Sequence, residues 1–164
     1  MITELPWLPD LVYLSEYDGN WNKYLEAIYN YFYQDFVVDQ PVFQGNKLAL
    51  KRHPLYAGKE ITFWHIISEG DTEDDRIPDL RRCERIRWPR PVIENCEDSY
   101  IKIWENTRRN EIRICIFLDF VDYLVVIAKR SGYNLLWTAY PVTRSHQKRK
   151  LMKEYHAYIK ANAA

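Results

Sequence analysis

The chain has 164 residues, of which 47% are hydrophobic and 28% charged, and equal numbers of acidic and basic residues give it a formal net charge of zero. This composition is ordinary for a soluble globular protein, and the length suits one domain with a real hydrophobic core. Zero net charge argues against indiscriminate binding to nucleic acids. No apolar run approaches the length that spans a bilayer, so we expect no membrane association.

Several sequence patterns that mark common sites are absent. The cysteines Cys83, Cys96 and Cys115 form neither a CxxC pair nor a zinc-binding pattern with histidine. We therefore expect free thiols, a cytoplasmic location and no cofactor. The N-terminus lacks a basic region followed by an apolar one, which predicts no secretion signal. Glycine-rich phosphate loops, a GxSxG elbow and an HExxH pair are also missing, which removes nucleotide hydrolases, serine esterases and zinc peptidases as first choices.

The first 40 residues are expected to cover a sheet. Residues 1–20 contain Pro6, Pro9 and Gly19, which predict an extended lead-in that ends in a turn. Residues 21–36 place apolar side chains at helical spacing, and this pattern predicts an amphipathic helix. The apolar stripe is most simply explained as the face that packs on the sheet.

Short strands and one ambiguous segment follow. Residues 42–43 and 47–51 are predicted to be strands joined by the turn at residues 44–46. Residues 60–68 (EITFWHIIS) are mostly apolar, so periodicity alone cannot separate a buried strand from a helix. Their β-branched and aromatic content favours a strand.

An arginine-rich helix is expected after the ambiguous segment. Residues 69–75 are predicted to form a solvated acidic loop, and the helix is predicted to begin at residues 77–79, where proline and aspartate suit a first turn. Pro89 and Pro91 are expected to interrupt it. We assign no role to the WPRP motif of residues 88–91.

The last third of the chain predicts a sheet and a helix. Four apolar segments separated by short turns predict an antiparallel meander, with strands at residues 101–105, 112–117, 123–128 and 135–142. A basic helix is expected at residues 145–160. The predicted fold is α+β: a four-stranded antiparallel meander packed against N-terminal, central and C-terminal helices. We expect a single domain, 1–164, with an N-terminal cover (1–40), a His/Arg-rich region (41–96), the meander (97–143) and the C-terminal helix (144–164).

The remaining reactive side chains suit RNA cleavage by transesterification, which needs no cofactor. Histidine serves as base or acid near neutral pH, arginine matches two phosphate oxygens, and hydroxyls donate to the same oxygens. The candidate catalytic residues are His65, Arg82, Arg85, Thr138 and Tyr140. Thr138 and Tyr140 share a strand face because strand side chains alternate. The candidate substrate-binding residues are His53, Arg81, Arg90 and Arg144.

Each candidate also has a structural explanation. His65 lies in an apolar run and is about as well explained as a core histidine. The arginines of residues 81–85 could pair with neighbouring carboxylates on the helix surface. Cross-strand packing explains Thr138 and Tyr140 equally well.

The order of elements resembles that of the barnase/EndoU/colicin/RelE-like ribonucleases, in particular their phage and mobile-element forms. Residues 64–66 (WHI), the arginine stretch 81–90 and residues 138–140 (TAY) carry the resemblance, which covers roughly residues 45–145. It implies helices packed on a curved antiparallel sheet and RNA cleavage without metal. It also implies His65 as base or acid, Arg82 and Arg85 as phosphate clamps, and Thr138 and Tyr140 as donors.

Three functions follow as alternatives. The first is a metal-independent endoribonuclease, a toxin or defence protein with an RNA substrate and a neutralising antitoxin as partners; it predicts that His65 and the arginines converge in one cleft. The second is a non-catalytic interaction module, antitoxin-like or an adaptor, which predicts that His65 is buried and paired and that the arginines are dispersed. The third is a non-catalytic nucleic-acid-binding protein that uses the basic final helix. The sequence leaves the oligomeric state open.

Overall fold

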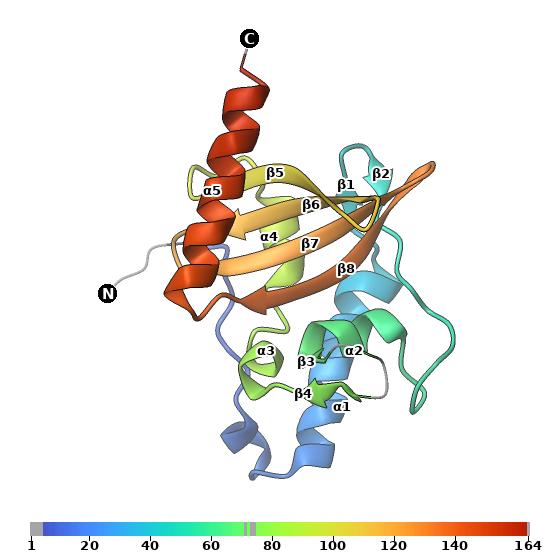
Figure 1. Ribbon diagram of the computed structural model, residues 1–164. Coiled ribbons are helices and arrows are strands. Elements are labelled where there is room, and N and C mark those ends of the chain that lie inside the picture. Colours follow the sequence, from blue (N-terminus) through green and yellow to red (C-terminus); the bar gives the residue numbers. More distant parts are fainter. Residues whose placement is uncertain (1–4, 71, 73–74, 164) are drawn as a thin grey trace.

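The computed structural model of the chain describes residues 5–70, 72 and 75–163. Its centre is a four-stranded antiparallel sheet, and helices from the N-terminal, central and C-terminal parts of the chain pack on it (Figure 1). The predicted α+β fold is therefore confirmed. Residues 1–4 of the expected lead-in and residues 71, 73 and 74 of the expected acidic loop lie outside the described residues.

Short helices and two small hairpin sheets accompany the main sheet. The α-helices are α1 (Trp21–Phe32), α2 (Ile61–Ile67), α3 (Leu80–Glu84), α4 (Pro89–Glu94) and α5 (Ser145–Ala161). The short strands pair as β1 (Val42–Phe43) with β2 (Asn46–Lys47) and β3 (Ser68–Glu69) with β4 (Ile77–Pro78). Within the part of the chain that the structure describes, none of the helices has the length and apolar character needed to cross a membrane.

The main sheet is the meander that the sequence predicts. Its strands lie in chain order: β5 (Ile101–Arg108), β6 (Glu111–Leu118), β7 (Tyr123–Arg130) and β8 (Tyr133–Pro141). The pairing of β7 with β8 shifts between Val126 and Ile127, because Val126 faces Thr138 and Ile127 faces Leu136. Trp137 is the extra residue of this β-bulge, a feature that redirects side chains locally.

The two faces of the sheet pack against different helices. One face contributes Ile116 and Val125 to the main core, which also contains Val92 of α4. The opposite face buries Trp104 in a second cluster against Tyr155 of α5. Figure 1 shows α4 behind the sheet and α5 crossing in front of one end of the strands. No residue of α5 is fully buried, so this helix rests on the sheet surface.

Helix α1 confirms the amphipathic helix predicted for residues 21–36. Asn20 caps it, since the Asn20 side chain accepts a hydrogen bond from the Lys23 backbone N–H at 3.0 Å. The helix buries its apolar side chains in the main core and continues as a π-helical turn over Tyr33–Val38. It packs beside α2 through the Tyr29 and Phe63 rings, whose centres are 5.1 Å apart.

The prediction of a strand at residues 60–68 is wrong, because Ile61–Ile67 forms helix α2. Every residue of α2 except Trp64 is buried. A helix buried on nearly all sides carries no polar face, so the spacing that would reveal it is missing from the sequence. The buried carboxylate of Glu60 precedes α2 and accepts a hydrogen bond from the Tyr29 hydroxyl at 2.7 Å, which holds α2 against α1.

The predicted central helix begins later than expected and is divided. Ile77–Pro78 pairs as strand β4, and α3 starts after Asp79, whose carboxylate accepts a hydrogen bond from the Arg81 N–H at 2.9 Å. Pro89 begins α4 instead of ending a helix. Proline suits this position because the first N–H groups of a helix have no partner inside it.

The second predicted short strand, residues 47–51, is also shorter, since only Asn46–Lys47 pairs as β2. Ala49 instead bridges the outer edge of β8. Its N–H donates to the Asn134 carbonyl and its carbonyl accepts from the Leu136 N–H, both at 2.9 Å. This bridge covers part of an edge that would otherwise leave backbone groups unpaired.

Candidate functional site

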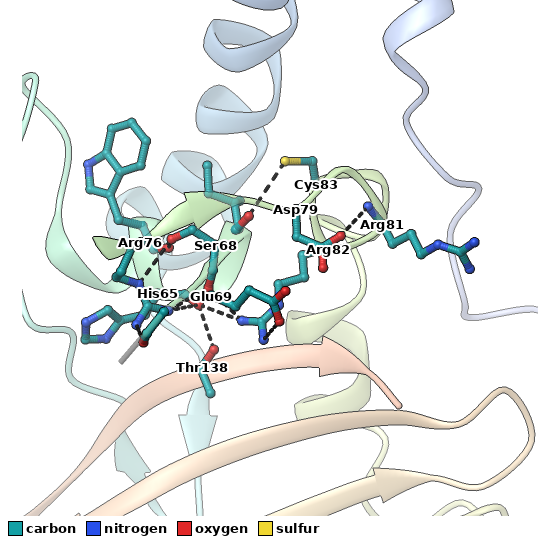
Figure 2. A network of polar contacts seen from close by, with 12 residues as sticks. His65, Ser68, Glu69, Arg76, Asp79, Arg81, Arg82, Cys83 and Thr138 are labelled. Atoms are coloured by element: carbon teal, nitrogen blue, oxygen red, sulfur yellow. Dashed lines mark hydrogen bonds and ion pairs between the residues drawn. The ribbon is translucent and has the colours of Figure 1, made fainter. Parts of the chain in front are cut away.

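Three side chains converge on one backbone oxygen near the end of α2. The carbonyl oxygen of His65 accepts hydrogen bonds from Arg76 Nη2 at 3.2 Å, Arg82 Nη1 at 3.3 Å and Thr138 Oγ1 at 2.8 Å (Figure 2). The last carbonyls of a helix have no partner within the helix, and positive charge is favourable at that end. These three residues therefore satisfy a carbonyl group near the C-terminal end of α2, and Arg82 and Thr138 join this helix to α3 and β8.

Arg82 makes further contacts on both sides of this carbonyl. Its Nη1 also donates to the Ser68 carbonyl at 2.8 Å, and its guanidinium carbon lies 4.8 Å from the centre of the Tyr140 ring. Its Nη2 lies 3.8 Å from a carboxylate oxygen of Glu69, whose side chain is largely exposed, whereas the Arg82 side chain is only 12% exposed. Burial raises the pKa of Tyr140, and the charge of Arg82 opposes that rise.

The imidazole of His65 lies apart from these hydrogen bonds. Figure 2 shows it pointing away from the Arg82 guanidinium and the Thr138 hydroxyl, although the His65 carbonyl contacts both. The residue is 4% exposed, and its ring centre is 4.9 Å from that of Trp137. The predicted catalytic residues therefore meet through the main chain of His65, while its side chain packs beside Trp137.

Arg85, the remaining predicted catalytic residue, lies in a different environment. Its guanidinium carbon is 5.2 Å from the Trp88 ring centre, and its Nη1 donates to the Arg81 carbonyl at 3.0 Å. The side chain of Arg81 itself is exposed. The structure thus gathers His65, Arg82, Thr138 and Tyr140, and it places Arg85 on another side of α3.

The predicted substrate-binding residues are dispersed. Arg90 ties α4 to the end of the α1 region, with Nη1 donating to the backbone carbonyls of Asp35, at 2.5 Å, and Asp39. His53 is exposed and precedes a cis peptide bond to Pro54. Arg144 is exposed and immediately precedes α5. These contacts assign Arg90 a structural role and place the other two on the surface.

A cavity of about 110 Å³ adjoins the group around His65. Thr138 and Tyr140 both line it, as the alternation of strand side chains predicts. Asn106 and Arg108 of β5 and Arg113 of β6 add further polar groups. Because Thr138 also donates to the His65 carbonyl, this cavity and the α2 terminus share one side chain.

The rest of the cavity wall is apolar. It consists of Cys115, Leu124, Val126 and Trp137 from the sheet and Leu151 from α5. Burial raises the pKa of the Cys115 thiol to about 12, so that this group stays protonated at neutral pH. The cavity therefore combines an apolar wall with a few polar groups.

Two arginines of the cavity were missed in the sequence analysis. Arg113 Nε donates to Glu111 at 2.8 Å, and its guanidinium carbon lies 4.8 Å from the Trp137 ring centre. Arg108 is exposed and makes no ion pair or side-chain hydrogen bond with any residue that the structure describes. The signal that could have found them is the strand register, since counting alternate residues across the meander puts both on the face of Thr138.

The charge of the cavity suits an anion. Arg108 and Arg113 both line it, whereas no carboxylate does. Among residues 5–70, 72 and 75–163, no group of three or more His, Cys, Asp or Glu side chains is arranged to hold a metal ion. The described groups can therefore bind a phosphate through guanidinium and hydroxyl donors.

Comparisons with protein-family models, with curated proteins and with solved structures found no match for this chain.

Proposed function

We propose that the protein is an endoribonuclease that cleaves RNA by acid–base transesterification without a metal ion. The observation that supports this proposal is the cavity beside His65, where two arginines face two hydroxyl-bearing side chains, Thr138 and Tyr140. A guanidinium fork matches the oxygens of a phosphodiester, and hydroxyl donors strengthen the same contact as negative charge develops.

In the proposed reaction, a base removes the proton of the ribose 2′-hydroxyl, and the 2′-oxygen forms a bond to phosphorus. The bond from phosphorus to the 5′-oxygen breaks, and an acid supplies a proton to that oxygen, which leaves a 2′,3′-cyclic phosphate. Arg108 and Arg113 hold the phosphoryl oxygens, and Tyr140 donates a hydrogen bond to them, whereas the hydroxyl proton of Thr138 is shared with the His65 carbonyl. We assign the proton transfers to His65 because its ring packs against Trp137, which forms part of the cavity wall, and histidine is the commonest general acid–base residue.

The geometry changes the proposed role of two arginines. Arg82 Nη1 donates to the carbonyls of His65 and Ser68, so Arg82 acts as a positioning residue that holds α2 against β8. Arg85 faces Trp88 and receives no part in the reaction. The phosphate-binding role that the resemblance implied for these two passes to Arg108 and Arg113.

The resemblance to the barnase/EndoU/colicin/RelE-like ribonucleases is consistent with this proposal, because it implies helices packed on an antiparallel sheet. As part of the same proposal, the protein acts in the cytoplasm as a toxin or defence protein and is neutralised by a partner protein. The three free cysteines, Cys83, Cys96 and Cys115, suit such a reducing compartment.

The burial of His65 favours a second candidate function. A non-catalytic interaction module predicts that this histidine is buried, and the residue is indeed only 4% exposed. In that case, the contacts of Arg82 serve stability alone. The two candidates differ in one measurable respect, which is turnover of RNA.

The test uses the purified full chain, end-labelled single-stranded RNA and EDTA. Wild type is compared with Arg108→Ala and with Arg109→Ala, a matched control in the adjacent β5–β6 turn that does not line the cavity. We expect cyclic-phosphate fragments from wild type and from the control. We expect a rate about 100-fold lower for Arg108→Ala, the scale of losing one donor to the reacting group.

Two further results would decide between the candidates. His65→Ala should abolish cleavage, whereas His146→Ala on the exposed first turn of α5 should leave it unchanged. Intact RNA after incubation with soluble, folded wild-type protein would reject the ribonuclease. That result would leave the interaction module as the better explanation of the buried His65.

A further inference from the structure

Helix α5 carries positive side chains along its outer side. Arg149, Lys153 and Lys160 recur at intervals of four and seven residues, a spacing that places side chains on one side of a helix. All three side chains are exposed, and none forms an ion pair with a residue that the structure describes. We call these three residues the basic face of α5. Their charge is not neutralised within the described part of the chain.

The acidic residue of α5 lies on the other side of the helix. Glu154 is the only carboxylate between residues 145 and 161. It accepts hydrogen bonds from the Trp104 indole at 3.2 Å and from the Asn106 amide at 3.0 Å, so its charge is directed to the sheet. The ammonium group of Lys148 pairs with carboxylates of the β6–β7 turn. Neither group therefore offsets the charge of the basic face.

The positive charge of α5 is unfavourable for the isolated helix. Arg149 and Lys153 are four residues apart, and like charges at this spacing repel each other. The first turn of α5 has no acidic residue, although the helix dipole favours one there, and Arg144 at the N-cap position makes no capping hydrogen bond. A negatively charged partner along the helix would offset these costs, so the arrangement indicates a polyanion.

The zero net charge of the chain conceals a separation of charge. Helix α5 contains five lysine and arginine residues against one glutamate, whereas residues 10–39 contain six carboxylates and one lysine. Helix α1 packs into the main core on one face of the sheet, and α5 packs on the opposite face (Figure 1). An approaching polyanion is therefore attracted to the side of α5 and repelled from the side of α1.

The surroundings of the basic face favour a nucleic acid over a membrane or a protein. Helices that bind membranes insert their apolar side, but Leu151, Tyr155 and Tyr158 of α5 already pack against the sheet. Protein interfaces are depleted in lysine and depend on apolar or aromatic anchors at their centre. The exposed Ile159 projects about 100° away from Lys160 around the helix and supplies no such anchor.

Lys150 connects the basic face with the cavity. Leu151 of α5 lines the cavity, so the helix that carries the basic face also forms part of the cavity wall. Lys150 is exposed and lies one helical turn from Glu154, whose carboxylate contacts Asn106 of the same cavity. A strand that leaves the cavity on this side therefore passes Lys150 before it reaches the basic face.

We propose that the basic face of α5 binds the phosphates of a single-stranded RNA beyond the phosphate that Arg108 and Arg113 hold. Arg149 and Lys160 are separated by about 16 Å along the helix axis, at a rise of about 1.5 Å per residue, so the face spans several consecutive nucleotides. Phosphate contacts by lysine and arginine carry affinity without sequence preference. This inference rests on the proposed function for its choice of RNA, and it adds that the length of the RNA governs affinity.

The test measures fluorescence anisotropy of labelled 2′-O-methyl RNA, which lacks the attacking hydroxyl and stays intact. A 12-nucleotide and a 3-nucleotide oligomer are bound to the full chain, to Arg149→Gln/Lys153→Gln/Lys160→Gln and to a control. Glutamine retains the helix propensity of lysine and arginine. The control, Lys23→Gln/Lys47→Gln/Lys51→Gln, removes the same charge from exposed positions outside α5.

The loss of three phosphate contacts sets the expected result. The basic-face variant should bind the 12-nucleotide oligomer about 100-fold more weakly at 0.1 M salt, and the slope of log K against log salt concentration should become less steep by about two. The control should change the affinity less than about threefold. The 3-nucleotide oligomer should bind the variant and wild type alike, because it is too short to reach from the cavity along the basic face.

A second variant keeps every cation in place. Ala157 is exposed and lies within one helical turn of Lys153 and Lys160, so Ala157→Glu puts a negative charge on the binding surface. Glutamate is a good helix former, and the variant should fold and bind the 12-nucleotide oligomer about tenfold more weakly than Ala157→Gln. Wild-type affinity in both the triple variant and Ala157→Glu would overturn the proposal. Phosphatidylserine vesicles or polyglutamate that bind as tightly as the oligomer would also overturn it, in favour of a membrane or an acidic protein.

The binding and cleavage assays fail independently. In cleavage of unmodified RNA, we expect the basic-face variant to raise KM for the 12-nucleotide substrate and to leave kcat unchanged. Binding through the basic face without cleavage would reject the ribonuclease and retain the RNA-binding face. Cleavage by the variant with wild-type KM would retain the ribonuclease and reject the RNA-binding face.

Discussion

Replacing Arg82 with alanine tests whether this residue serves mainly to hold α2 in place. The side chain is mostly buried, and Nη1 donates to the carbonyls of His65 and Ser68 at 3.3 and 2.8 Å. The guanidinium also lies over the ring of Tyr140 at 4.8 Å. All three contacts disappear in the variant.

The expected cost follows from what remains after the substitution. The His65 carbonyl keeps Arg76 and Thr138 as donors, and the Ser68 carbonyl keeps Arg76 at 2.6 Å, so no acceptor is left without a partner. The loss is then about 1.5–3 kcal/mol for the shorter charge-assisted hydrogen bond, to Ser68, and about 0.5–1 kcal/mol for the contact with the ring. The bond to His65 is long, at 3.3 Å, and adds little. The Glu69 ion pair adds little because the Glu69 side chain is solvated. We expect a total of about 2–4 kcal/mol, which in a chain of this size lowers Tm by roughly 5–15 °C.

Urea unfolding followed by tryptophan fluorescence and circular dichroism measures this free energy. Arg81→Ala is the matched control, since Arg81 lies on the same helix with an exposed side chain, and its substitution should cost less than about 0.5 kcal/mol. If Arg82→Ala unfolds at the same urea concentration as this control, Arg82 does not secure the end of α2. A loss of RNA cleavage in that variant would then report on chemistry alone.

Three further predictions concern Asp35, Lys148 and Cys115. Burial raises the pKa of Asp35 to about 6, so its ionised form destabilises the fold as pH rises through that value. Asp35→Asn should therefore increase the free energy of unfolding at pH 8 by up to about 3 kcal/mol and have little effect at pH 4. Equal effects at both pH values in urea unfolding would contradict this reasoning. Lys148 Nζ lies 3.1 Å from a carboxylate oxygen of Asp119 and 2.8 Å from one of Asp122. Lys148→Ala should therefore speed amide hydrogen exchange in the first turns of α5 without changing exchange in β6. Unchanged exchange in α5 would show that these ion pairs do not hold the helix. Burial raises the pKa of the Cys115 thiol to about 12, so Ellman's reagent at pH 8 should fail to label it until urea is added. Rapid labelling of the folded protein would mean that the cavity opens.

The meander was predictable because it depends on pairing between strands that are neighbours in the sequence. The segments of β5 to β8 have either alternating apolar and polar residues or continuous apolar residues. The connections between them are short, so neighbouring strands pair in chain order. The sequence also predicted that Thr138 and Tyr140 share a face. It did not place Arg108 on the same face, because the first strand was predicted to end at residue 105, so the register across the sheet was not carried as far as Arg108.

Helix α2 shows where sequence reasoning fails. Its β-branched residues favour a strand locally, yet the segment is enclosed by α1, α3 and the β8 edge, and tertiary packing outweighs that preference. The interactions of His65 were hidden for a related reason. Its role in the network depends on its carbonyl oxygen, which every residue possesses, so no residue type could signal it.

The shared carbonyl also determines which variants can report on function. Because the His65 carbonyl joins α2, α3 and β8, substitution of its donors Arg82 or Thr138 changes the stability of the same packing that shapes the cavity. Substitution of His65 keeps the carbonyl but removes the ring that packs beside Trp137 of the cavity wall. A fall in activity in these variants therefore combines two effects. Arg108 is exposed and makes no ion pair with a described residue, so its removal should leave the free energy of unfolding almost unchanged. A large loss of RNA cleavage in Arg108→Ala at unchanged stability would locate the chemistry in the cavity, and an equal loss in Arg109→Ala would reduce it to general attraction between positive charge and RNA.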